Sequence, residues 1–262
     1  MSSTRSAFRP APVIKAADSA PADAAVILVG HGSSRMAAAV LGVDRLAAAL
    51  REREGYAEVA VATLHGSGPR PADVIAALAH THAFVVPVMM CDGLTVQRDL
   101  PAAFSGCGSL RLRFCQPVGT HPGLAALIAD RAVQEAKLRN LHLAQTRLLL
   151  IAHGSTKNTR SEKATLLQVG RLSAMNLFRE VAAAYLEQPP SIVDAIQRLR
   201  PPVIAVGLFA AEGQHATVDV EAALAAAGRP DVAYLGAIGT DPGMVQLVAA
   251  LIRSEARTGR YR

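Results

Sequence analysis

The chain has 262 residues, a length that suits one or two domains. Hydrophobic residues make up 51% of it and charged residues 18%, which excludes a disordered or fibrous protein. The net charge of +6 indicates an anionic partner. Because the basic residues are scattered, only 4% of residues are aromatic and no nucleic-acid motif is present, we expect a small polyanionic substrate rather than nucleic acid.

The sequence lacks the usual signals for membranes or secretion. No apolar run approaches the ~20 residues that a membrane-spanning helix needs, and no apolar core follows the first basic residues. Residues 1–22 are rich in alanine, serine and proline, which predicts a flexible tail, with an organelle transit peptide as the alternative. Cys91, Cys107 and Cys115 lack CxxC spacing, so they favour neither disulfides nor a cysteine zinc site. We therefore expect a cytoplasmic protein without membrane contact.

The chain contains an internal repeat. Four segments of the first half recur in order in the second half, at offsets of 122, 122, 120 and 120 residues: VILVGHGSS (26–34) with LLLIAHGST (148–156), ATLH (62–65) with AYLE (184–187), CDGLT (91–95) with AEGQH (211–215), and GTHPG (119–123) with GTDPG (239–243). A duplication that produced two similar halves of about 120 residues explains this pattern.

Each half alternates strand-like and helix-like segments. In chain order, the second half predicts strand 147–152, helix 159–178, strand 181–186, helix 190–199, strand 203–210, helix 221–227, strand 232–238 and helix 243–256. Such alternation is typical of a parallel sheet with helices on both faces. The sequence therefore predicts two tandem, doubly wound α/β domains at residues 23–143 and 144–262.

Three titratable residues of the second half follow successive predicted strands. His153 comes after the first strand, Glu187 after the second and His215 after the third. Ligands of open parallel sheets bind beyond the carboxyl ends of the strands, so these side chains are expected to converge. Imidazole and carboxylate suit a first-row divalent metal and proton transfer. Taken singly, each residue also fits a structural role: a strand-to-helix turn, a solvated loop or a helix start.

The first half differs at two of these positions. His31 matches His153, but His65 replaces the glutamate and Thr95 replaces the second histidine. A diverged duplicate of this kind predicts one working site in the second half and a degenerate site in the first. A second site that uses His31 and His65 is the alternative.

The motifs resemble those of the CbiX-type sirohydrochlorin chelatases, which belong to the class II tetrapyrrole chelatases. The resemblance rests on the HGS motif at 153–155, on AYLE at 184–187 and on LFAAEGQH at 208–215 with Asp219 after it, and it covers nearly the whole chain past the tail. It implies insertion of Co²⁺ or Fe²⁺ into sirohydrochlorin, in cobalamin or siroheme biosynthesis. No organic cofactor is implied, and the divalent metal is a substrate.

The resemblance also implies roles for individual residues. His153 is expected to accept a proton and bind the metal, His215 to be the second metal ligand, and Glu187 to assist proton removal and face the substrate. The loop expected to border the macrocycle consists of Ala210, Ala211, Glu212, Gly213 and Gln214. The family loop usually reads closer to Gly-Gly-His, so Glu212 adds a charge beside the site.

These roles fit the chemistry of metal insertion. The macrocycle loses two N–H protons as the metal enters, and an imidazole, whose reference pKa is ~6.5, accepts a proton at neutral pH. Lys157, Arg160 and Lys163 follow the HGS motif and are candidates for steering the anionic substrate, unless they form a solvated helix face. We expect a monomer or homodimer with a cleft between the halves. A non-catalytic tetrapyrrole- or metal-binding protein of the same fold is the alternative function.

Overall fold

The computed structural model describes residues 24–32, 38–54, 56, 58–66, 68–106 and 110–258. Within these residues the strands form two four-stranded parallel sheets, in the orders β2-β1-β3-β4 and β6-β5-β7-β8. The strands are β1 (Ala25–Gly30), β2 (Val59–Thr63), β3 (His82–Pro87), β4 (Arg111–Phe114), β5 (Arg147–Ala152), β6 (Glu180–Tyr185), β7 (Val203–Gly207) and β8 (Val232–Ala237). The two orders are the same, which confirms the predicted pair of similar doubly wound α/β units.

Helices connect the strands as the sequence predicts. They are α1 (Ala38–Glu54), α2 (Pro71–Ala77), α3 (Leu100–Ala103), α4 (Gly123–Leu138), α5 (Arg160–Ala174), α6 (Ile192–Arg198), α7 (Val220–Ala226) and α8 (Met244–Thr258). Two π-helical turns, Thr95–Asp99 and His215–Asp219, precede α3 and α7. None of the described helices combines the length and apolar character that a membrane crossing needs. The predicted tail at 1–22 and Cys107 lie outside the described residues.

Three predicted element boundaries are wrong for local reasons. The helix expected over 159–178 ends at Ala174, before Asn176 takes a positive φ of 53°. The helix expected from Pro190 begins at Ile192, because the Ser191 hydroxyl accepts a hydrogen bond from the Asp194 amide at 3.1 Å and so caps the helix. The strand expected over 203–210 ends at Gly207. Leu208 and Phe209 are buried in the apolar core, and residues 208–210 also line a cavity, so their apolar character reflects burial beyond the end of the strand.

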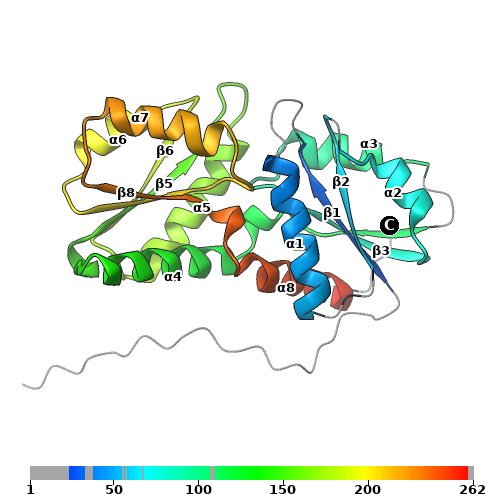
Figure 1. The fold of residues 1–262 in the computed structure, drawn as a ribbon. Helices are drawn as coiled ribbons and strands as arrows, with labels where there is room; N and C mark the ends of the chain where they lie inside the picture. Colours follow the sequence, from blue (N-terminus) through cyan, green and yellow to red (C-terminus); the bar gives the residue numbers. More distant parts are fainter. Residues whose placement is uncertain are drawn as a thin grey trace, which may run out of the picture.

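The helices form three layers around the two sheets. Helices α2 and α3 cover one face of the first sheet, and α6 and α7 cover one face of the second. Helices α1, α4, α5 and α8 lie between the other two faces and share one continuous apolar core (Figure 1). Because each sheet is covered on both sides, its central strands are buried along their length, as the apolar runs of β1 and β5 require.

The last helix of each half packs against the other half. Helix α4 lies beside α5 under the second sheet, and α8 lies beside α1 under the first (Figure 1). The Arg131 guanidinium of α4 donates to the Ala237 carbonyl of β8 at 3.0 Å. In return, Arg113 of β4 donates to the Glu255 carbonyl of α8 at 3.2 Å. The sequence repeat divides the chain at 143/144, but the packing joins α4 to the second sheet.

Candidate active site

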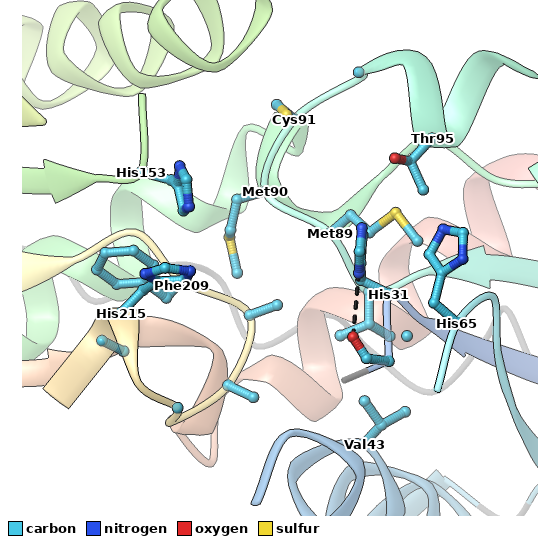
Figure 2. Close-up of a pocket in the computed structure, with 18 of the residues that line it drawn as sticks. His31, Val43, His65, Met89, Met90, Cys91, Thr95, His153, Phe209 and His215 are labelled. Carbon is cyan, nitrogen blue, oxygen red and sulfur yellow. Dashed lines mark hydrogen bonds between the residues drawn. The ribbon is translucent and has the colours of Figure 1, made fainter. Parts of the chain in front are cut away.

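A hollow lies where the carboxyl ends of both sheets meet. Its volume is about 710 Å³, and residues from both halves line it. Figure 2 shows four histidines around it: His153 and His215 from the second half, and His31 and His65 from the first. Pockets for small molecules are commonly ~300–1,000 Å³, so this hollow suits a sizeable organic ligand.

His153 and His215 form a close pair on the wall made by the second half. His153 follows β5 and His215 follows β7, the adjacent strands from which the chain crosses to opposite sides of the sheet. This switch point is where open parallel sheets bind ligands. The two ring centroids are 4.5 Å apart, and the rings are nearly perpendicular, at 80°. The predicted convergence of these two residues is thus present in the structure.

Each ring of this pair is oriented through its Nδ1 atom. Nδ1 of His153 lies 3.2 Å from the Gly154 carbonyl, and Nδ1 of His215 lies 2.7 Å from Oδ2 of Asp219. Both partners are acceptors, so Nδ1 must carry the proton in these bonds. In the neutral rings, each Nε2 then keeps its lone pair for a metal ion or a proton.

Asp219, for which the sequence predicts no role, contacts His215. It ends the π-helical turn that begins at His215, and the i, i+4 spacing brings the two side chains together. The Tyr234 hydroxyl donates to the Ala216 carbonyl at 2.6 Å, which fixes the turn against β8. Burial raises the pKa of Tyr234, so this phenol stays a donor. The His-x-x-x-Asp spacing is the signal that points to this residue.

Glu187 lies beside His153 but is not among the residues that line the hollow. Its Oε2 atom is 3.6 Å from Nδ1 of His153, and its side chain is 54% exposed. The parallel pairing of β5 and β6 continues past the strands, since the Glu187 amide donates to the His153 carbonyl at 2.9 Å. This position suits a group that passes protons to solvent behind the ring. It does not place Glu187 on the wall that a substrate would touch.

Gly154 allows the chain to turn sharply after His153. Its φ is +75°, and an added Cβ would lie 2.9 Å from Cβ of Tyr185 and 2.8 Å from Cγ of Gln188. The Gln188 side chain in turn accepts a hydrogen bond from the Ser155 amide at 2.7 Å. Glycine adopts this positive φ without strain, and the conformation holds the HGS turn against the end of β6.

The loop from Ala210 to Gln214 forms part of the wall, as the resemblance implied. The Glu212 carboxylate accepts a hydrogen bond from the Ala237 amide at 2.9 Å, so its charge is fixed at the end of β8. Of the three expected steering residues, Lys157 and Lys163 are exposed and outside the wall. Arg160 donates to the Asp92 carbonyl at 2.9 Å and thereby ties the second half to the first.

The first half places its own histidine pair on the same hollow. The centroids of His31 and His65 are 4.9 Å apart, with 51° between the rings. The His65 amide donates to the His31 carbonyl at 3.0 Å, as the Glu187 amide does to that of His153, so His65 occupies the backbone position of Glu187. Among the described residues, no three His, Cys, Asp or Glu side chains gather closely enough to hold a metal together.

Comparisons with known proteins find relatives with similar sequences and similar folds. A probable sirohydrochlorin cobaltochelatase of Halobacterium salinarum is 23% identical over 255 aligned residues, which cover 83% of this chain and 87% of that protein. A solved structure of CbiX, described as the terminal enzyme for biosynthesis of siroheme in denitrifying bacteria, has a TM-score of 0.75 at 28% identity and covers 88% of this chain and 98% of that one.

A further solved structure shares the fold. SirB from Bacillus subtilis, solved with Fe³⁺, has a TM-score of 0.78 at 18% identity and covers 91% of this chain and 98% of that one. The CbiX family profile matches residues 25–135 and again residues 147–255. Since the same family unit matches twice and spans most of the sequence, the chain belongs to the CbiX family.

Proposed function

We propose that this protein is a sirohydrochlorin chelatase that inserts Co²⁺ or Fe²⁺ at the His153–His215 pair. The observation that carries the proposal is the 4.5 Å separation of the two rings at the switch point of the second sheet, on the wall of a 710 Å³ hollow. Two imidazoles with water in the remaining positions hold a divalent ion while leaving it open to exchange. An ion that is transferred to a macrocycle needs such exchangeable coordination positions.

The proposed mechanism assigns both roles of an imidazole to this pair. Nε2 of His153 and Nε2 of His215 bind the ion, with their rings held through Gly154 and Asp219. As the ion passes to the macrocycle nitrogens, Nε2 of His215 and then Nε2 of His153 are released, and each accepts one of the two pyrrole protons. Glu187, 3.6 Å from Nδ1 of the His153 ring, stabilises the resulting imidazolium and passes the proton to solvent.

The names of the relatives support both metals, and one of them supports the siroheme pathway. The Halobacterium protein is named a probable cobaltochelatase, whereas the CbiX structure is described as belonging to siroheme biosynthesis. SirB of Bacillus subtilis was solved with Fe³⁺ and in complex with cobalt. Imidazole ligands accept either metal. We therefore propose cobalamin or siroheme biosynthesis as the setting, with the metal as a substrate and no organic cofactor.

An anaerobic absorbance time course tests the proposal. Sirohydrochlorin and Co²⁺, then Fe²⁺, are followed with and without the protein, with His153→Ala and with His142→Ala as the matched control. His142 lies in the connection between the halves and outside the hollow. We expect metallation that depends on the protein, is lost in His153→Ala and persists in His142→Ala. A wild-type rate equal to the spontaneous rate for both metals overturns the proposal.

A binding protein without turnover is distinguished by the His215→Ala variant. If the protein is a chelatase, this change abolishes metallation while binding of sirohydrochlorin, measured by fluorescence quenching, persists. If wild type binds the macrocycle but does not metallate it, the non-catalytic alternative holds.

A further inference from the structure

The first half also has a second histidine beside its HGS histidine, but this second histidine follows a different strand. In the second half the pair comes from the ends of β5 and β7, whereas His31 and His65 come from the ends of β1 and β2. A degenerate site would keep the HGS histidine alone. Here a histidine stands where the second half has Glu187, with its ring centroid 4.9 Å from that of His31. Both side chains are exposed and line the hollow, so neither is a buried packing residue.

The ring of His31 is held in the same way as that of His153. Its Nδ1 atom lies 3.1 Å from the Gly32 carbonyl, against 3.2 Å for His153 and Gly154. Gly32 has a φ of +81°, and its missing Cβ would lie 1.9 Å from the His65 carbonyl oxygen. This close approach places the turn after His31 directly against the backbone of His65. Nε2 of His31 keeps its lone pair, as a metal ligand must.

A carboxylate accompanies this pair as well. Asp99 ends the π-helical turn Thr95–Asp99, just as Asp219 ends the turn His215–Asp219, at the repeat offset of 120 residues. Asp99 is ion-paired with Arg98 at 2.8 Å. The two imidazoles, rather than this carboxylate, are therefore the groups that the first half offers to a dication.

We propose that His31 and His65 bind a second divalent transition-metal ion of the Co²⁺, Ni²⁺ or Zn²⁺ class, separately from the His153–His215 pair. Figure 2 shows the two pairs on opposite sides of the hollow, with Met90 between them in that view. Nitrogen ligands favour these ions over Mg²⁺ or Ca²⁺. Water completes the shell, because the described residues supply no third ligand at this position. The proposal concerns the ion alone and does not depend on sirohydrochlorin being the substrate.

Anaerobic calorimetric titration with Co²⁺ alone tests this site. The His153→Ala/His215→Ala variant removes the other pair and isolates the proposed one, and we expect it to bind one Co²⁺. Adding His31→Gln and His65→Gln, which keep polar side chains of similar size, should weaken the remaining affinity at least tenfold. Adding His142→Ala instead, which removes an imidazole outside the hollow, should leave the affinity unchanged. No binding in the first variant, or equal affinity after the glutamine changes, overturns the proposal.

A spectroscopic measurement keeps the test valid if the glutamine variant unfolds. Pulsed electron paramagnetic resonance of Cu²⁺ bound to His153→Ala/His215→Ala should show coupling to the nitrogens of two imidazoles. Absence of such coupling refutes the site. Failure here leaves the proposed chelatase function intact, since the activity assay with His153→Ala tests that function alone.

Discussion

Replacing Asp219 with asparagine should weaken metal handling without unfolding the protein. The carboxylate accepts a hydrogen bond from Nδ1–H of His215 at 2.7 Å and selects the tautomer whose Nε2 can bind an ion. Loss of such a partner typically costs 10–100-fold in metal affinity or activity, which is about 1.4–2.8 kcal/mol. His215 and Asp219 are 53% and 33% exposed, so the pair should contribute less than about 1 kcal/mol to folding.

The assay separates a positioning role from a structural one. For Asp219→Asn we expect the apparent affinity for Co²⁺ to fall 10–100-fold, with tetrapyrrole binding and Tm close to those of wild type. Asp73→Asn is the matched control, since Asp73 is an exposed carboxylate on α2, paired with Arg70 and outside the hollow. If Asp219→Asn retains Co²⁺ affinity within twofold of wild type, the argument that Asp219 orients His215 is refuted.

Three further predictions concern the scaffold. Gly154→Ala should lower the free energy of unfolding in urea by about 1–3 kcal/mol, because φ is +75° and the new Cβ would lie 2.8 Å from a side-chain carbon. Gly170→Ala is the control, since Gly170 lies in α5 with open space around it, and this change should raise the free energy of unfolding by about 0.5–1 kcal/mol. Equal effects of the two changes would contradict this reasoning. Arg131→Ala removes a 3.0 Å bond to the Ala237 carbonyl and should cost about 1–3 kcal/mol by the same titration; no measurable cost would mean that this bond does not secure α4. A fragment of residues 144–262 lacks α4 and should show no cooperative thermal transition by circular dichroism, whereas a Tm near that of the full chain would show that the exchange of helices is dispensable.

Much of the fold follows from local pattern. The repeat offsets and the apolar runs bounded by turns predict the two parallel sheets, because buried parallel strands need continuous apolar sequence. The exchange of α4 and α8 is not predictable in this way. Both helices have an apolar face that fits against either sheet. The sequence of the helix alone therefore does not determine which sheet it covers. The amphipathic pattern of α4 therefore indicates burial but not its partner.

The site was only partly predictable for a related reason. The positions of His153 and His215 after adjacent strands indicate convergence, because the carboxyl ends of parallel strands share one edge. Both halves face one hollow because of the way the two sheets pack together. The sequence pattern of a single strand contains no information about that packing. The role of Asp219 depends on a π-helical turn, which sequence pattern predicts poorly. The catalytic roles of His153, Glu187 and His215 stay predictions until the variants are measured.

The equivalent backbone positions of Glu187 and His65 have a consequence for symmetry. In a dimer of identical subunits, a substitution at this position would appear on both walls of the shared hollow at once. Joining the two units in one chain removes that constraint. At this position the second half has a carboxylate that lies beside its HGS histidine and outside the hollow, while the first half has an imidazole that lines the hollow. A planar substrate held between them would meet two chemically different faces, so its orientation in the hollow would affect the reaction.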